Sequence, residues 1–176
     1  MARSDLAFSA RALRWSVLAS VVAVAGTAHA GTRSGSTVPV LGSAFSSKVV
    51  VVCGRALAEK KAEPPFPFGD FNPTKPEISK LPAIGRYEAA GVRIFRSWLR
   101  RMLALGQPPR GRTRWSALLK ALRAHTRIIA DQQAAALRRD GAAFTRDFYA
   151  GNAAQRAMVR AADAAGVPIC ATAAGA

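Results

Sequence analysis

The sequence is poor in the residues that most often carry chemistry. Its 176 residues include two cysteines and two histidines, and only 10 acidic residues stand against 26 basic ones. It contains no Glu-x-x-His pair, so the di-iron site that some helical bundles hold has no ligands. One histidine beyond the first thirty residues and two cysteines are too few for a transition-metal site. We therefore expect no bound metal and no cofactor.

The motifs of common enzyme classes are missing as well. No serine stands in the strand-turn-helix setting of a nucleophile elbow, and a Ser-His-Asp triad would have to use His125. No glycine-rich phosphate loop follows a predicted strand. The sequence therefore predicts a protein that is not an enzyme.

The apolar run from Trp15 to Ala25 is too short for a good membrane span.

The first thirty residues have the order of a secretory signal peptide. Arg3, Arg11 and Arg14 form a basic start, an apolar run follows, and Ala28-His29-Ala30 is a small-x-small cleavage site. We expect cleavage after Ala30 and a secreted or extracytoplasmic protein of the cell envelope. An uncleaved N-terminal anchor is the alternative.

The rest of the chain divides by composition. Residues 31–45 are rich in Gly, Ser and Thr and predict a flexible linker. A helical domain is expected over 46–171, and a short tail over 172–176. Three segments repeat apolar residues at the three- and four-residue spacing of one helix face. They are Ala83–Leu105, Thr113–Arg139 and Asp140–Ala165, with Thr113 and Asp140 as expected N-caps.

The segment Ser46–Glu63 allows two interpretations. The β-branched run Val49–Val52 favours a strand by propensity. A capping serine before it and the helix-forming residues from Ala56 to Lys61 after it favour a helix. We prefer the helix, and the strand stays open.

The segment from Pro64 to Pro82 contains six prolines, which exclude regular structure. Phe66, Phe68 and Phe71 interrupt the prolines. We expect an ordered strap whose aromatic rings lie on the core, and an exposed partner-binding patch is the alternative. Four helices joined mostly by short turns predict an all-α, antiparallel up-and-down four-helix bundle, with the strap between its first two helices.

The only two cysteines, Cys53 and Cys170, are expected to form a disulfide bond. An exported chain meets oxidising conditions, and in such a bundle the end of the last helix returns to the start of the first. Two alternatives exist. A lipid-modified Cys53 would need a small residue before it, where Val52 stands, and two free buried thiols would be unusual outside the cytoplasm.

Arginine residues cluster on the outer side of the second predicted helix and at the turn after it. Arginine binds phosphate bidentately, so anionic lipid or a cell-wall polymer is the expected partner, and nucleic acid is an unlikely one for an exported chain. A solvated charged face is the alternative. The candidates are Arg86, Arg93, Arg96, Arg100, Arg101, Arg110, Arg112 and Arg114.

Polar residues also fall on the inner side of the predicted helices. His125 and Gln132 lie at helical spacing, and Gln155 lies on the inner seam of the last helix. One interpretation is a satisfied polar layer that sets the register of the bundle. The other is a pocket for a small ligand, which would make the protein a carrier. No pattern in the sequence predicts an oligomeric state.

Several short motifs occur in a recognisable order. Val52-Cys53-Gly54-Arg55-Ala56 lies on the first helix, Leu105-Gly106-Gln107-Pro108-Pro109 ends the second, and Trp115-Ser116-Ala117-Leu118-Leu119 opens the third. These motifs are followed by an Arg139–Ala142 turn, by an Ala-rich helix with Asn152, and by the closing segment Ala165–Ala171. This order resembles the small, uncharacterised exported or lipid-anchored helical proteins of high-GC actinobacteria. The resemblance covers about Ser46 to Ala171 and implies a helical fold and an envelope location, but no reaction.

Overall fold

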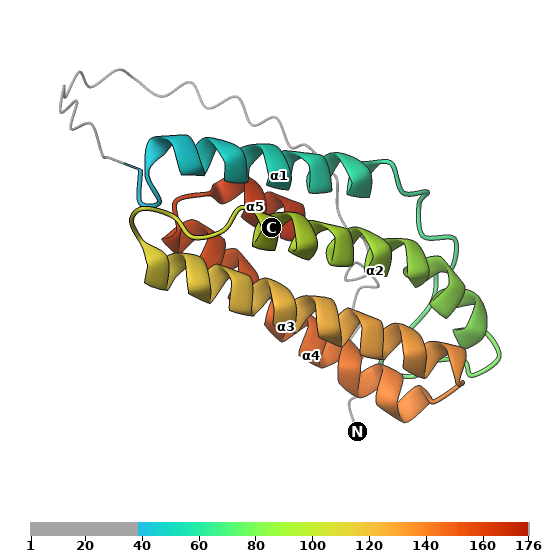
Figure 1. Cartoon of the computed structure of the whole chain (residues 1–176). Helices are drawn as coiled ribbons and strands as arrows, with labels where there is room; N and C mark the ends of the chain where they lie inside the picture. Colours follow the sequence, from blue (N-terminus) through green and yellow to red (C-terminus); the bar gives the residue numbers. More distant parts are fainter. Residues whose placement is uncertain (1–38, 176) are drawn as a thin grey trace, which may run out of the picture.

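The computed structural model describes residues 39–175, so the predicted signal peptide and most of the predicted linker lie outside the described residues. The described range is all-helical, as expected, and contains no strand. None of its helices is both long enough and apolar enough to cross a membrane. Its five helices are α1 (Ser43–Lys61), α2 (Leu81–Ala104), α3 (Arg112–Leu137), α4 (Gly141–Ala164) and α5 (Pro168–Ala174) (Figure 1).

Helix α1 contains Val49–Val52, so the helical interpretation of this run is confirmed. Phe45, Val49, Cys53 and Ala56 are its buried residues, and their spacing of three and four is that of one helix face. The helix begins at Ser43, before the predicted start at Ser46. Phe45 anchors this first turn, because its ring packs edge-on against Trp115 with centroids 5.0 Å apart.

The turn between α2 and α3 explains where α3 begins. The expected N-cap was Thr113, but the cap is Gly111, which has a positive φ of 64°. A Cβ at this position would lie 2.6 Å from the Val40 carbonyl oxygen, so only glycine fits both the backbone and the space. Asp140, by contrast, caps α4 as predicted, because its carboxylate accepts a hydrogen bond of 2.9 Å from the Ala143 amide.

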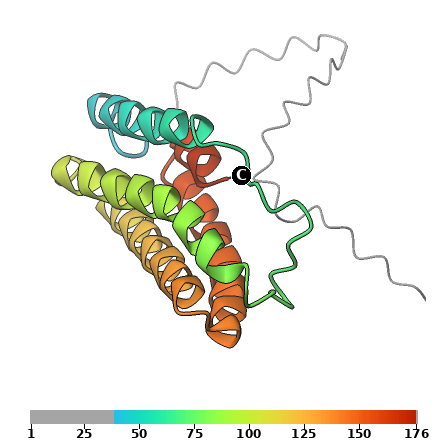
Figure 2. The ribbon, with the colours of Figure 1, turned by 90° about the vertical axis from the view of Figure 1, so that its right-hand side faces the viewer.

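The short helix α5 was not predicted. Gly166, with a φ of 71°, ends α4 as expected, but Pro168 then opens a new helix that runs to Ala174, into the predicted tail of residues 172–176. Proline suits a first helical turn because the amide that it lacks would have no partner there. Helix α5 packs against both α1 and α4, while α2 packs against α1 and α3, and α3 against α4 (Figures 1 and 2). The four predicted helices are therefore joined by a fifth one, which lies between the first and the last.

The buried side chains form two clusters. The first cluster combines residues of α1 to α5, among them Phe95, Trp98 and Trp115. The second cluster lies toward the other end of α2 and consists of Phe71, Leu81, Ile84, Ala135, Ala136, Ala143 and Phe144. Phe71 belongs to the proline-rich segment and packs edge-on against Phe144, with centroids 5.7 Å apart. Phe66 and Phe68 are half-buried beside it, so the core interpretation of these rings is confirmed.

Candidate functional site

Basic residues dominate the surface of α2 and the first part of α3. From Ala89 to Ala130 the sequence contains ten Lys or Arg residues and no Asp or Glu. Seven of the eight arginines singled out from the sequence have exposed side chains on α2 or near the turn that follows it. They define the basic surface: Arg86, Arg93, Arg96, Arg100, Arg110, Arg112 and Arg114. Their guanidinium groups are available to anions from solvent.

Arg101 does not belong to this surface. Its guanidinium binds the Glu59 carboxylate on α1 through two hydrogen bonds of 2.8 and 2.7 Å. These bonds, helped by Arg55, lower the pKa of Glu59 to about 2 despite some desolvation. Arg101 therefore joins α1 to α2. The sequence suggested a surface role because it shows only where an arginine falls along the chain, not which acid reaches it.

Most acidic side chains of the described range are engaged locally. Glu77 pairs with Lys80 at 2.7 Å, and Asp147 pairs with Arg146 at 2.9 Å. Asp131 lies 3.7 Å from Arg127, at the end of the acid-free stretch. Glu63 lies near enough to Arg93 to interact with its charge, but no arginine of the basic surface forms a salt bridge within residues 39–175.

The two cysteines meet as predicted. The Sγ atoms of Cys53 on α1 and Cys170 on α5 lie 2.08 Å apart, which is a disulfide distance. Both residues are fully buried in the first cluster, and the Met102 sulfur packs 4.0 Å from the Cys53 sulfur. The pair thus holds the short α5 against α1, across 117 residues of sequence.

His125 is buried between α3 and α2. Its ring packs edge-on against Phe95 with centroids 4.7 Å apart, and its Nδ1 has no hydrogen-bond partner within residues 39–175. Burial, and secondarily the positive charge of Lys60, lowers the pKa of His125 to about 4. The imidazole is therefore neutral at physiological pH and acts mainly as a packed aromatic ring.

Gln132 lies further along the same face of α3 and reaches a different partner. Its Nε2 donates a hydrogen bond of 2.8 Å to Glu88 Oε1 on α2. The other carboxylate oxygen, Oε2, is buried without a hydrogen-bond partner among the described residues. Burial raises the pKa of Glu88 to about 7, although the bond from Gln132 opposes the shift.

Gln155 belongs to a third environment, at the end of α5. Its Nε2 donates a hydrogen bond of 3.0 Å to the Gly175 carbonyl oxygen. Lys60 of α1 donates one of 2.9 Å to the Ala173 carbonyl oxygen, and burial lowers its pKa to about 8. His125, Gln132 and Gln155 thus contact different groups, and the structure does not bring them together into one pocket.

Sequence reasoning missed the two charged residues of this interior, Glu88 and Lys60. A signal was present for both. Glu88 comes four residues after Ile84 and four before Val92, two buried residues of α2. Lys60 likewise comes four residues after the buried Ala56 of α1. A charge at helical spacing from core positions indicates a group that folding partly desolvates.

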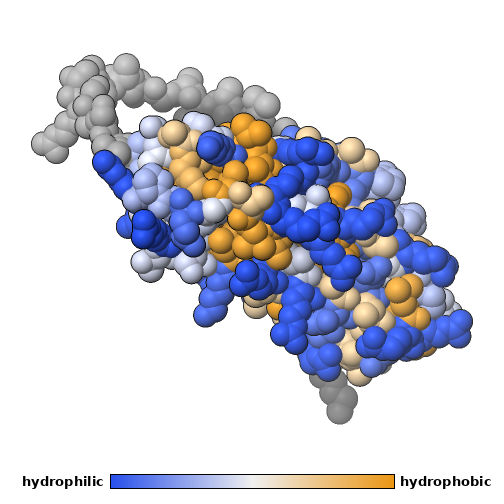
Figure 3. Space-filling view, in the orientation of Figure 1, coloured by the Kyte–Doolittle hydropathy of each residue, from blue (hydrophilic) through white to orange (hydrophobic). Residues whose placement is uncertain are grey.

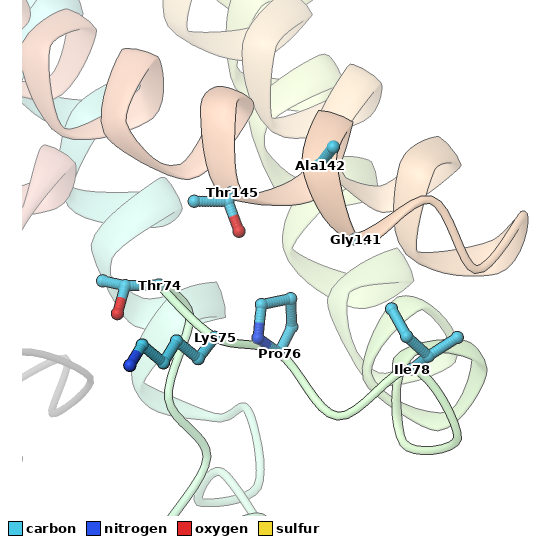
Figure 4. Close-up of a pocket in the computed structure, with 7 residues that line it drawn as sticks. All are labelled: Thr74, Lys75, Pro76, Ile78, Gly141, Ala142 and Thr145. Carbon is cyan, nitrogen blue, oxygen red and sulfur yellow. The ribbon is translucent and has the colours of Figure 1, made fainter.

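Two of the surface hollows bear on the candidate residues. One, of about 530 Å³, lies between the proline-rich segment and the start of α4 (Figure 4). Its lining residues are Thr74, Lys75, Pro76, Ile78, Gly141, Ala142 and Thr145. The other lies beside α4 and includes Gln155, Arg156 and Arg160. Neither is lined by His125 or Gln132, and in the described range no three His, Cys, Asp or Glu residues could together hold a metal ion.

Comparison with known proteins finds no matching family model, no similar curated protein and no similar solved structure.

Proposed function

We propose that this chain is an exported, non-enzymatic helical protein that binds the anionic surfaces of a cell envelope, which are anionic lipid or wall polymer. The observation that carries the proposal is the basic surface. Its seven arginines are exposed on or around an acid-free stretch, where few carboxylates compete for them. Phosphate groups are the natural ligands of such a surface, because the planar guanidinium donates two parallel hydrogen bonds to them.

The proposal includes the architecture and the route of export. The four long helices would run up and down, with the proline-rich segment as a strap that covers one end. The N-terminal signal would be cleaved after Ala30, which would deliver the domain to an oxidising compartment where Cys53 and Cys170 pair. The resemblance to exported proteins of high-GC actinobacteria supports this proposed location.

A small-ligand carrier is the weaker alternative. It was based on His125, Gln132 and Gln155, and each of these residues packs against or binds a different part of the protein. A carrier of this kind needs a cavity lined by convergent polar groups. The geometry supports surface binding better.

Binding that rests on exposed charges has a clear signature. Salt screens such charges over about 8 Å at physiological ionic strength, so affinity should fall steeply as salt is added. The test measures binding of the full chain to soluble polyphosphate and to vesicles with anionic lipid, at low and at high salt. Binding at low salt that disappears at high salt is the expected result, and no binding at low salt would refute the proposal.

A matched pair of variants assigns the binding to the basic surface. In one variant Arg96, Arg100 and Arg114 become Gln. In the control Arg138, Arg156 and Arg160 become Gln, which removes the same charge from exposed positions elsewhere. Each surface arginine contributes about 1 kcal/mol near an anionic surface, so the first variant should bind about a hundredfold more weakly. An equal loss in both variants would show that net charge, and not this surface, decides binding.

A further inference from the structure

Positive charge continues from α2 into α3, beyond the basic surface. Lys120 and Arg123 on α3 are exposed, and neither forms a salt bridge within residues 39–175. One turn further on, Arg127 lies 3.7 Å from Asp131, so the row of cations without an acidic neighbour ends there. Two cations of α3 thus add to the seven arginines of the basic surface.

Helices α2 and α3 lie side by side and run in opposite directions (Figure 1). The ring of His125 on α3 packs against Phe95 on α2. Seven residues later in α3, Gln132 binds Glu88, which lies seven residues earlier in α2. Because equal steps along the two helices lead from one contact to the next, a single register holds over this interval.

The same register brings cations of the two helices level with one another. A hydrogen bond of 2.9 Å from the Trp115 indole to the turn after α2 continues the register to this end of both helices. Counted from the contact between the two rings, Arg100 lies level with Lys120, and Arg96 lies within one residue of the level of Arg123. The two levels are about 6 Å apart along the helices, and the axes of packed helices are about 8–10 Å apart. Four cations therefore stand two by two across the line where α2 meets α3.

The contacts of α2 show on which side of the helix its two arginines lie. Gly85 faces α3, because a Cβ at this position would lie 2.9 Å from the Leu137 side chain. Arg96 comes eleven residues after Gly85, which is about three helical turns, so it lies on the same side of α2. Arg101, which binds an acid of α1, is turned by about 140° from Arg96. Arg96 and, one turn further on, Arg100 are exposed on the side of α2 that borders α3, away from α1.

The cations of α3 lie on the outer side of that helix. Leu118 and Leu122 are fully buried in the first cluster, whereas Lys120, between them in the sequence, is exposed. Arg112 and Arg123 are also exposed, and their spacing of eleven residues places them on one side of α3, about 16 Å apart. Because the first cluster lies beneath both helices, their exposed cations face the same way. We call this surface the α2–α3 strip, which consists of Arg96, Arg100, Arg112, Lys120 and Arg123.

The strip offers little apolar surface to a bilayer. Within residues 89–130, Leu103 is the one large apolar side chain that is exposed, and Leu99 and Leu119 are partly buried against the first cluster. Figure 3 shows hydrophilic side chains over much of α2 and α3, while apolar surface gathers over α1 and around the C-terminal end of α2. Peripheral proteins hold to a bilayer by large apolar side chains together with charge. The strip therefore fits a ligand that supplies phosphate groups alone.

We propose that the α2–α3 strip binds a linear wall polymer whose repeating unit carries a phosphodiester, and that the polymer lies along the two helices. This inference rests on the proposed function and names its partner. Cations from both helices contact successive phosphates of one chain from its two sides. Once the first contact has formed, the next phosphates are held near the strip at a high effective concentration, so several weak contacts together give firm binding.

A second copy of the chain is a poorer occupant of the strip. An isologous dimer would place the same cations opposite one another without acids between them, and like charges disfavour such an interface. Charge complementarity therefore favours a polyanion.

The experiment measures binding of the full chain to poly(glycerol phosphate), a soluble phosphodiester polymer, at low and at physiological ionic strength. The variant K120Q/R123Q removes two charges from the strip and keeps all seven arginines of the basic surface. It should bind the polymer about thirtyfold more weakly. R156Q/R160Q is the matched control, since it removes two charges from exposed positions on α4. At physiological ionic strength, where charges more than about 8 Å away are largely screened, the control should bind much as the unmodified chain does.

A gain of binding guards against variants that simply fold poorly. Ser116 is exposed on α3 between Arg112 and Lys120, so S116K adds a cation to the strip and should bind the polymer about fivefold more tightly. A153K adds the same charge at an exposed position on α4 and should change the affinity little. Affinity should also rise with the length of the polymer until one chain spans the strip.

Three outcomes would overturn the inference. If K120Q/R123Q and S116K both bind like their controls, α3 plays no part, while the arginines of the basic surface and the proposed function stand. If the unmodified chain binds vesicles of phosphatidylglycerol and phosphatidylcholine but not the polymer, a bilayer is the partner. Tighter binding to a single-stranded oligonucleotide with the same number of phosphates would assign the strip to nucleic acid.

Failure of the proposed function itself has a different signature. In that case the unmodified chain would bind neither poly(glycerol phosphate), nor polyphosphate, nor anionic vesicles at low salt. The two failures therefore remain distinguishable.

Discussion

The two buried clusters of this protein are built by different means. The first cluster joins residues far apart in the sequence and contains two fully buried tryptophans and the buried cysteine pair. The second joins α2, α3 and α4 near their other ends and is completed by Phe71 from a segment without a helix. The difference teaches that one end of a small helical domain can be held together by a cross-link, and the other end by an aromatic side chain from a segment without a helix.

A polar pair separates the two clusters. On α2, Glu88 lies between Ile84 of the second cluster and Phe95 of the first. On α3, Gln132 lies between Leu122 of the first cluster and Ala135 of the second, and it binds Glu88. A polar pair at this junction favours one register of α2 against α3, because a shifted register would leave both groups buried without partners.

The largest expected effect comes from breaking the first cluster. Replacing both cysteines, as C53A/C170A, removes a cross-link that spans 117 residues. In the chain-entropy view such a link contributes about 4–5 kcal/mol, so the free energy of unfolding under oxidising conditions should fall by about that amount. Denaturant unfolding measures it. The control is the unmodified chain under a reductant, which should approach the stability of the variant; equal stability of all three would contradict a stabilising bond.

The substitution F71A should destabilise the second cluster. Phe71 is 6% exposed and contacts the rings of Phe66 and Phe144, so truncation should cost about 3 kcal/mol of unfolding free energy. F68A serves as the control, because Phe68 is only half-buried and should cost about 1 kcal/mol. If F71A costs no more than F68A, the proline-rich segment does not stabilise this end of the protein.

The Glu88–Gln132 pair between the two clusters should give an effect of similar size on the free energy of unfolding, and this effect depends on pH. The folded pKa of Glu88, about 7, lies above its ordinary value of 4.5, so the folded state holds a proton that the unfolded state releases. Unfolding free energy should therefore fall as pH rises from about 4.5 to about 7, by about 3 kcal/mol, and stay low above that. E88Q removes this titration and keeps an oxygen that accepts from Gln132.

The measurement is the difference in unfolding free energy between the unmodified chain and E88Q, taken by denaturant unfolding at several pH values. The titrations of His125 and Lys60 are common to both proteins and cancel in this difference. E88Q should gain stability relative to the unmodified chain as pH rises through the interval. A difference that does not change with pH would show that the Glu88 carboxyl titrates normally.

Much of the helical framework follows from local patterns. The apolar stripe of α2, the Asp140 cap of α4 and the stop at Gly166 are written in short stretches, where helix period and turn chemistry act on neighbouring residues. The pairing of Cys53 with Cys170 was also predicted, since they are the only two cysteines of the sequence, but it is the unpredicted α5 that carries Cys170 to α1. The basic surface could be listed from the sequence except for Arg101.

Other features depended on contacts between distant residues. The start of α3 was misjudged because the close approach of Val40 to Gly111, and not the hydroxyl of Thr113, decides the cap. The role of Arg101 depended on Glu59, which lies 42 residues earlier in the chain. The choice between a polar layer and a ligand pocket for His125, Gln132 and Gln155 also depended on the fold, in which each side chain meets a different neighbour.

The sequence by itself thus determined the helical class, the positions of four long helices and the excess of positive charge, since these depend on composition and on spacing along the chain. Only the tertiary structure decided that α5 lies between α1 and α4, and that Glu88 and Lys60 are partly buried in the interior. The physical reason is that burial and pairing depend on which surfaces meet, and two helices with similar stripes can meet in several ways until their side chains are packed.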